Sequence, residues 1–245
     1  MRLIRAKDYA EVSRKAGQII AAQIQLKPDC VLGLATGSSP VGTYQELIAK
    51  YQQGDLDFSQ VKTINLDEYV GLTADHDQSY AYFMRTNLFD HVNIDPKNCN
   101  IPNGMNPDAA AECARYDAIV DGFGGADLQL LGLGPNGHIG FNEPGEAFVP
   151  GTNLVDLTPS TIDANQRFFA KREDVPTQAY TMGIGSIMKA KRVLLVVNGK
   201  GKAQAVKDCF FGPIKPQAPG SILQLHPDFI LVADEDALSL VQDLL

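Results

Sequence analysis

Two clusters of acid–base side chains lie far apart in the chain, and each follows an apolar run. Asp67 and Glu68 end the stretch TINLDE, while His138 and Glu143 lie in the glycine-rich stretch GPNGHIGFNE. If both runs are strands of one parallel sheet, their carboxyl ends bring the clusters to the same edge, where open α/β sheets bind ligands. Carboxylates and imidazoles are groups that transfer protons near neutral pH. The sequence therefore predicts proton-transfer chemistry.

Both clusters also have a purely structural interpretation. An aspartate at a strand end can cap a turn, and because Asp67 and Glu68 are adjacent, we expect at most one of them to face a substrate. Burial would raise the pKa of that carboxyl group toward the range of a working base. A loop histidine is often bonded only to backbone. The glycines around His138 nevertheless allow a ligand to approach closely, and Glu143 lies close enough in sequence to orient the imidazole.

A short turn rich in hydroxyl groups lies between a predicted buried strand and a predicted helix, and it consists of Thr36, Gly37, Ser38 and Ser39. Backbone N–H groups in a tight turn and at a helix N-terminus attract anions, and hydroxyl groups suit phosphate oxygens. The turn is neither a Walker A loop nor a dinucleotide-binding GxGxxG motif. Arg167 and Lys202 could clamp a phosphate. The alternative is a serine N-cap before a proline, with two ordinary surface cations.

Helices and strands alternate along the chain in a way that predicts how these residues are positioned. Helical spacing of apolar residues predicts helices over 9–26, 41–51, 79–89, 108–120, 202–210 and 236–244. Short apolar runs predict buried strands over 31–35, 61–66, 128–133, 193–197 and 229–233. Such alternation indicates right-handed βαβ units, a parallel sheet and helices on both of its faces. We expect residues 1–245 to form a single domain, with an irregular, functional segment over 134–175.

Composition restricts the classes of protein that this chain can belong to. The 245 residues are 44% hydrophobic, which is enough for a substantial core, and 21 basic against 29 acidic residues give a net charge of −8. No dense basic run indicates nucleic-acid binding, and no apolar stretch indicates a signal peptide or a membrane span. We therefore expect a cytoplasmic protein without nucleic-acid or membrane partners. The four cysteines show no CxxC spacing, so we expect core thiols rather than disulfides or a zinc site.

Several stretches taken together resemble one known family. The residues at 34–40, 65–72, 79–84 and 137–144 are closely similar to the glucosamine-6-phosphate deaminase family, and the likeness continues to Leu225-His226-Pro227. The resemblance implies a Rossmann-like three-layer α/β/α sandwich with a mostly parallel sheet. It also implies a role in amino-sugar catabolism, namely conversion of glucosamine 6-phosphate and water to fructose 6-phosphate and ammonia. The family uses no metal and no organic cofactor, so the resemblance implies none here.

The resemblance also implies roles for individual residues. Asp67 matches the base that takes the C2 proton of the sugar and returns it at C1. His138 matches the group that opens the pyranose ring, and Glu143 matches its acidic partner. The positions that match the family's phosphate-binding residues are Thr36, Gly37, Ser38, Ser39, Arg167 and Lys202.

One residue departs from the family's usual pattern. Many members carry an aspartate in the ring-opening group where this chain has Asn136. An amide cannot ionise, so Asn136 can orient its neighbours by hydrogen bonding but cannot supply a negative charge. Our hypothesis is that Glu143 provides the carboxylate and that Asn136 has a positioning role.

The resemblance leaves assembly and two other functions open. Members regulated by N-acetylglucosamine 6-phosphate are hexamers with a longer C-terminal region, so we expect a monomer or small homo-oligomer with hyperbolic kinetics. One alternative function is that of a 6-phosphogluconolactonase, which shares the fold and a histidine loop but needs no C2 base. The other is a non-catalytic sugar-phosphate sensor, which usually carries an additional DNA-binding or partner module.

Overall fold

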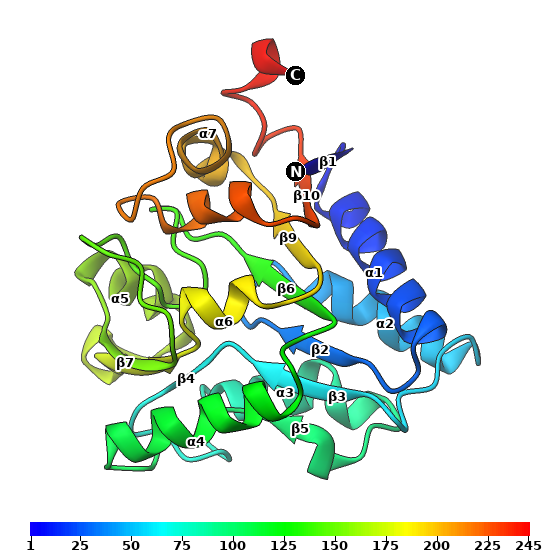
Figure 1. The fold of residues 1–245 in the computed structure, drawn as a ribbon, viewed down its shortest axis with the longest axis vertical. Coiled ribbons are helices and arrows are strands. Elements are labelled where there is room, and N and C mark those ends of the chain that lie inside the picture. Colours follow the sequence, from blue (N-terminus) through cyan, green and yellow to red (C-terminus); the bar gives the residue numbers. More distant parts are fainter.

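A seven-stranded parallel sheet organises the computed structural model, which describes residues 1–245 (Figure 1). Its strand order is β1-β10-β9-β6-β2-β3-β5, and every neighbouring pair is parallel. The strands are β1 (Arg2–Ala6), β2 (Val31–Leu34), β3 (Lys62–Asn65), β5 (Cys99–Asn100), β6 (Leu128–Gly132), β9 (Val193–Val197) and β10 (Phe229–Asp234). The predicted mostly parallel sheet is therefore confirmed.

Helices cover both faces of this sheet and complete the predicted three-layer sandwich (Figure 1). On one face lie α1 (Tyr9–Leu26), α2 (Val41–Gln52) and α3 (Tyr80–Asn87), and on the other lie α4 (Ala109–Gly122), α6 (Ile184–Met188) and α7 (Ala203–Phe210). A further short helix, α5 (Pro159–Asn165), follows β7 (Asn153–Asp156) in the chain. None of the helices combines the length and apolar character needed to cross a membrane.

The central strands explain the continuous apolar runs in the sequence. Every residue of β9 is buried, and its side chains alternate between the two cores. Leu194 and Val196 pack toward α1 and α2, while Leu195 and Val197 pack toward α6 and α7. Because both faces of such a strand are dry, the polar alternation of a half-exposed strand is absent.

A small second sheet extends the chain beyond the carboxyl end of β3. It consists of β4 (Asp67–Tyr69), β8 (Gln178–Thr181) and β7 (Asn153–Asp156), all antiparallel. Leu66 joins the two sheets, since its N–H donates to Leu34 O at 3.1 Å and its carbonyl accepts from Met182 N–H at 2.7 Å. The predicted irregular segment 134–175 thus contains β7 and α5, which the sequence did not indicate.

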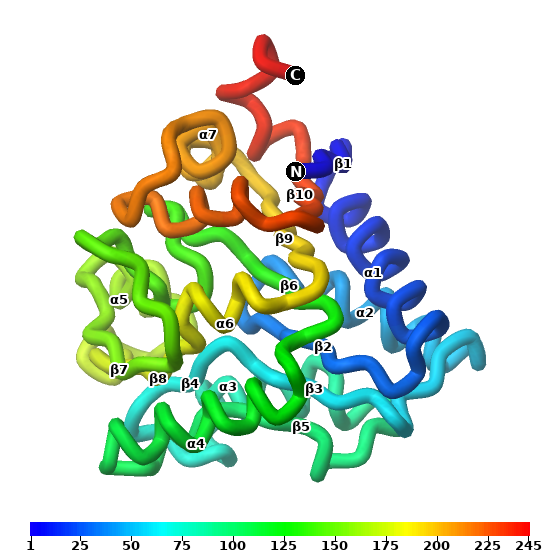
Figure 2. The backbone as a smooth tube through the Cα atoms, in the orientation of Figure 1, coloured from blue at the N-terminus to red at the C-terminus, as the bar shows by residue number.

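The predicted helix over 236–244 is wrong. The Asp234 carboxylate accepts from the Ala237 N–H at 2.8 Å, and this bond caps a turn where β10 ends. The residues that follow bond at i→i+3, for example Val241 N–H to Leu238 O at 3.0 Å, so separate tight turns form and only Gln242–Leu244 is a 3₁₀ helix. Strand β1, which the sequence did not indicate, pairs with β10, so both termini lie at the same edge (Figure 2).

The cysteines are all free, as expected, but only two of them belong to the core. Cys30 and Cys209 are buried, whereas Cys99 and Cys113 are partly exposed.

Candidate active site

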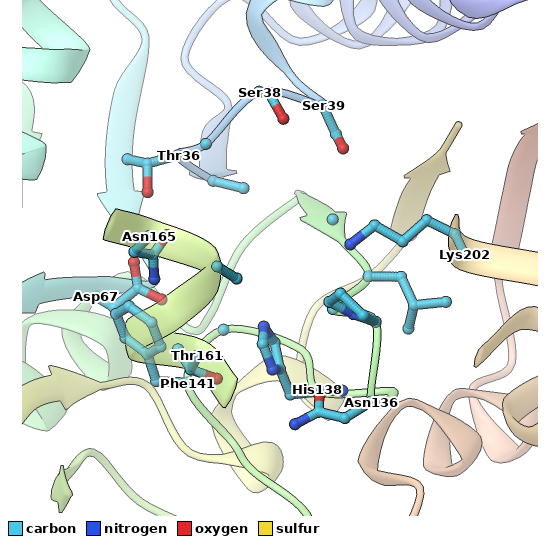
Figure 3. Close-up of a pocket in the computed structure, with 18 of the residues that line it drawn as sticks. Thr36, Ser38, Ser39, Asp67, Asn136, His138, Phe141, Thr161, Asn165 and Lys202 are labelled. Atoms are coloured by element: carbon cyan, nitrogen blue, oxygen red, sulfur yellow. Dashed lines mark hydrogen bonds between the residues drawn. The ribbon is translucent and has the colours of Figure 1, made fainter. Parts of the chain in front are cut away.

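A cavity of about 560 Å³ opens at the carboxyl ends of the central strands. Its walls come from the segments that follow β2, β3, β6 and β9 and from α5, which covers it (Figure 3). This is the position at which open parallel sheets bind ligands. The cavity is lined by nine of the ten residues predicted for the site, namely Thr36, Gly37, Ser38, Ser39, Asp67, Asn136, His138, Arg167 and Lys202.

The turn after β2 presents its hydroxyl groups to the cavity. Gly37 has φ +92°, a conformation that favours glycine. Helix α2 begins after Pro40 without a side-chain cap, so Ser39 is not the N-cap that the structural alternative predicted. Tyr9 of α1 fixes the turn, since its hydroxyl donates to Ser38 O at 3.0 Å and accepts from Gly42 N–H at 2.8 Å.

Two cations meet this turn from other parts of the chain. Arg167 Nη2 donates to Ser38 Oγ at 3.3 Å, and Lys202 lies at the start of α7. Burial and the nearby charge of Arg167 lower the pKa of Lys202 to about 8. Neither cation forms a salt bridge with a carboxylate of this chain. An anion bound between them would relieve their mutual repulsion, so this end of the cavity suits a phosphate group.

Asp67 reaches the cavity from β4, where it lies opposite Thr181. Its carboxyl group is buried, and no protein group donates a hydrogen bond to it. Burial, with the neighbouring charge of Glu68, raises the pKa of Asp67 to about 8. A carboxyl group in this setting has the properties of a general base for a carbon acid near neutral pH.

Glu68 points away from the cavity, as expected for adjacent residues of a strand. Its carboxylate accepts from the N–H groups of Tyr69, Tyr80 and Ala81, each at 2.9 Å, and so holds the first turn of α3. Burial raises the pKa of Glu68 to about 7, although these three donors oppose the rise. The structure therefore assigns Glu68 an anchoring role that the sequence did not indicate.

His138 lies in the loop after β6 with its Nδ1 atom buried and turned toward Glu143. Nδ1 lies 3.4 Å from Glu143 Oε2, which is an ion-pair distance without a directed hydrogen bond. Gly134 makes room for the imidazole, because a Cβ at that position would lie 2.4 Å from the ring. Glu143 itself does not line the cavity and stands behind His138.

Asn136 connects the members of this group. Its side chain donates to Glu143 Oε2 at 2.7 Å and accepts from the backbone N–H of His138 at 3.2 Å, so it contacts the backbone of His138 and not the ring. Burial acts to raise the pKa of Glu143, but His138, Thr161 and Asn136 together lower it to about 2. The carboxylate is therefore ionised throughout the neutral range.

Other lining residues were not predicted for the site. Tyr80 and Phe141 stack with ring centroids 6.0 Å apart and interplanar angle 13°. Thr161 and Asn165 come from α5, inside the segment that the sequence analysis left irregular. In the sequence, the helices that carry Tyr80, Thr161 and Asn165 are marked only by their N-cap residues. These are Ser79 before α3 and Thr158 before α5. The other three histidines, His76, His91 and His226, lie outside the cavity.

Comparisons with known proteins show the family to which the chain belongs. The family model described as glucosamine-6-phosphate isomerases/6-phosphogluconolactonase matches residues 6–230. A glucosamine-6-phosphate deaminase of Clostridium perfringens (strain SM101) is 57% identical over 242 residues, which cover 99% of this chain and 100% of the relative. That of Clostridioides difficile (strain 630) is 55% identical over 239 residues, covering 98% and 96%.

Solved structures resemble the chain to different degrees. A monomeric glucosamine-6-phosphate deaminase superposes with TM-score 0.96 at 46% identity, covering 98% of this chain and 100% of that one. A 6-phosphogluconolactonase from Thermotoga maritima superposes with TM-score 0.75 at 18% identity, covering 96% and 99%. The second likeness concerns the fold alone.

Proposed function

Because the chain belongs to the family of glucosamine-6-phosphate isomerases and 6-phosphogluconolactonases, we propose that it converts glucosamine 6-phosphate and water to fructose 6-phosphate and ammonia. Full-length relatives at 55–57% identity that bear the name glucosamine-6-phosphate deaminase support this reaction. The observation that carries the proposal is the placement of Asp67: a buried, unbonded carboxyl group shares one cavity with His138 and with two uncompensated cations.

The phosphate of the substrate binds at the Ser38 end of the cavity. Its oxygens accept from the turn and from Arg167 and Lys202, the groups that stand there without an anionic partner. Binding energy from this remote group holds the sugar against the acid–base residues, which converts a difficult proton abstraction into a positioned one. A bound phosphate would also favour the charged form of Lys202.

The pyranose ring opens next, with His138 moving a proton between the ring oxygen and the C1 hydroxyl group. Glu143 stays ionised beside Nδ1 and stabilises positive charge on the imidazole. Asn136 holds the Glu143 carboxylate and the His138 backbone in register. The product of this step is the open-chain aldehyde.

Asp67 then takes the proton from C2. The electrons of the broken C–H bond form the C1–C2 double bond of an enolamine, and the electrons of the C1 carbonyl move to O1, which takes up a proton. Return of the proton from Asp67 to C1, with loss of a proton from the amine nitrogen, leaves an imine at C2 and a hydroxyl group at C1. Water hydrolyses the imine to the ketone of fructose 6-phosphate and releases ammonia. Asp67 suits this shuttle because it must be ionised to accept the proton and must hold it long enough to return it, and its raised pKa allows both.

A lactonase function is disfavoured by the same residue. Hydrolysis of 6-phosphogluconolactone abstracts no C2 proton, so a buried free carboxyl group at Asp67 would have no role in it. The resemblance to 6-phosphogluconolactonases of known structure is 16–20% identity and supports only a shared fold. A sensor would not require the proton-transfer set at all.

We further propose a cytoplasmic monomer or small homo-oligomer. A solved deaminase at 46% identity is described as monomeric, and nine of the ten proposed site residues line one cavity of this chain. Phosphorylated sugars are retained inside cells by their charge, which favours a cytoplasmic location for an enzyme that acts on one.

One assay tests the reaction. Purified protein is mixed with glucosamine 6-phosphate, and ammonia and fructose 6-phosphate are measured together, with glucosamine and 6-phosphogluconolactone as comparison substrates. We expect ammonia and fructose 6-phosphate in equal amounts and little turnover of glucosamine, which lacks the phosphate. Isomerised sugar without ammonia would indicate a different aldose–ketose isomerase, and hydrolysis of the lactone would restore the lactonase alternative.

A further inference from the structure

The Glu143 carboxylate is shared between two segments of the chain. Its Oε2 atom accepts from Asn136 at 2.7 Å and faces His138, and both of these residues belong to the loop after β6. Its Oε1 atom accepts from the hydroxyl groups of Thr161, in a short hydrogen bond, and of Thr158 at 3.4 Å. The second pair of donors belongs to α5 and its N-cap. Each carboxylate oxygen therefore has its own set of partners.

The contact with His138 cannot by itself set the orientation of Glu143. At 3.4 Å and without hydrogen-bond geometry, this contact is too long and too poorly directed to fix the angle of the carboxylate. The terminal torsion of a glutamate is soft, so the plane of the carboxylate turns easily unless both oxygens are held. Asn136 holds Oε2, and Thr161 is the nearest donor that holds Oε1.

Thr161 is well placed to fix this torsion. It is buried, and it lies in the first turn of α5, where Thr158 caps its N–H at 3.3 Å. The two threonine hydroxyl groups also lie 3.1 Å apart, so each restricts the rotation of the other. Figure 3 shows Thr161 on the α5 side of the cavity, with Asn136 beside His138.

We propose that Thr161 is a positioning residue for the ring-opening step, whose hydroxyl group holds Glu143 so that Oε2 stays directed at His138. This inference rests on the proposed function and adds to it a residue outside the acid–base set. It predicts that losing the hydroxyl group impairs reaction of the cyclic sugar more than binding of an open-chain one.

The experiment must separate positioning from a merely structural role, because the same segment leads to Arg167, which contacts the phosphate turn at Ser38. Thr161→Val removes the hydroxyl group and keeps the volume, Thr161→Ser keeps the hydroxyl group, and Thr161→Ala removes both the hydroxyl group and bulk. Thr86→Val is the matched control, since Thr86 also lies in a helix but its hydroxyl group bonds only to the carbonyls of Tyr82 and Phe83 and to the side chain of Asn87.

Two quantities are measured for each variant: kcat/KM with glucosamine 6-phosphate, and the inhibition constant of 2-amino-2-deoxyglucitol 6-phosphate. The second compound is the reduced, open-chain form of the substrate and cannot close a ring. We expect Thr161→Val and Thr161→Ala to lower kcat/KM by about 10- to 100-fold, the loss typical of a misplaced catalytic group. The inhibition constant should stay unchanged, and Thr161→Ser and Thr86→Val should behave like the unaltered protein.

Two outcomes would overturn the inference. Unchanged kcat/KM in Thr161→Val and Thr161→Ala would show that Glu143 needs no such support. A parallel rise of the inhibition constant would show that Thr161 supports α5 and the phosphate end, or contacts the sugar directly. If the unaltered protein releases no ammonia from glucosamine 6-phosphate, the proposed function itself fails, which is distinguishable from either result.

Discussion

At the scale of single residues, Asp67 combines features that seldom occur together. It is an acid with no hydrogen-bond donor, it is buried, and it lies beside a second carboxyl group that three backbone donors hold in place. An unpaired buried carboxyl group is costly for a folded protein. Its cost is understandable if the group performs chemistry, because the same desolvation that destabilises it raises its basicity.

Replacing Asp67 by asparagine should separate catalysis from binding. The amide preserves shape and cannot accept the C2 proton, so we expect kcat to fall by about 100- to 10,000-fold, the usual contribution of a general base. Binding of 2-amino-2-deoxyglucitol 6-phosphate, measured by calorimetry, should remain close to that of the unaltered protein because the phosphate end is untouched. Equal losses of turnover and affinity would make Asp67 a binding residue instead.

Two groups should shape the dependence of kcat/KM on pH. Asp67 must be ionised, and its pKa of about 8 means that kcat/KM should fall by about tenfold per pH unit as pH drops below that value. Lys202 must be charged to bind phosphate, and its pKa of about 8 means that charge is lost as pH rises above it. We therefore expect a bell-shaped profile with its maximum near pH 8, measured at low substrate concentration.

Substitutions distinguish the acid and alkaline sides of this profile from ionisation of the substrate, because the substrate ionises in the same way with every variant. Lys202→Arg keeps a positive charge over the whole pH range, so the fall of kcat/KM on the alkaline side should move to higher pH. Glu68→Gln removes the charge beside Asp67 and so lowers the pKa of Asp67. The fall of kcat/KM on the acid side should therefore move to lower pH. If neither side responds, the profile belongs to the substrate or to other residues.

At the scale of elements, α1 supports the phosphate end without touching the cavity. Tyr9 in its first turn bridges Ser38 O and Gly42 N–H, so it connects the turn after β2 to the start of α2. Tyr9→Phe removes both hydrogen bonds. We expect a loss of about 1 kcal/mol in the free energy of unfolding, and a rise of about fivefold in KM if that energy orders the turn, with kcat nearly unchanged.

Urea unfolding and steady-state kinetics measure these effects. Tyr51→Phe is the control, because Tyr51 lies on α2 and packs against Phe58, away from the phosphate turn. A fall in kcat with an unchanged KM would mean that Tyr9 acts on the chemistry rather than on phosphate binding.

The elements that the sequence predicted well are those dominated by local pattern. Strands such as β9 are continuous apolar runs, and α1 has regular apolar spacing behind an aspartate N-cap. The candidate site followed from them, because strand ends converge at one edge of a parallel sheet whatever the details of the loops. Asp67, His138 and the turn after β2 could thus be placed together from the chain alone.

The remaining parts depend on contacts between distant residues. β4 is a strand only because β8 pairs with it, and its three residues carry too little pattern to indicate this. The role of Thr161 appears only when α5 lies against Glu143. The opposite error occurred at 236–244, where apolar spacing suggested a helix but the Asp234 cap imposed turns.

At the scale of the whole molecule, the distribution of charge matters more than its sum. The chain carries a net charge of −8, which would repel a sugar phosphate at long range. The cavity reverses this locally, because Arg167 and Lys202 stand there without carboxylate partners. Ion pairs neutralise many basic side chains elsewhere, for example Lys27 and Lys191 at Asp127. Arg167 and Lys202 thus give the cavity a local positive charge that suits an anion.

The proposed catalytic and phosphate-binding residues all line one cavity or stand directly behind it, and this leads to a prediction about cooperativity. Its lining residues come from the segments after β2, β3, β6 and β9, from α3, and from α5 with the turn that follows it. Because the residues that the proposed reaction uses all belong to one chain, we expect each cavity to act independently of any other copy. We expect a hyperbolic dependence of rate on glucosamine 6-phosphate, a specific activity independent of protein concentration, and no activation by N-acetylglucosamine 6-phosphate. Steady-state rates over a wide range of protein concentrations, with and without that compound, test all three expectations. A sigmoidal curve that N-acetylglucosamine 6-phosphate converts to a hyperbola would contradict the prediction and would require an effector site coupled to a second conformation of the cavity.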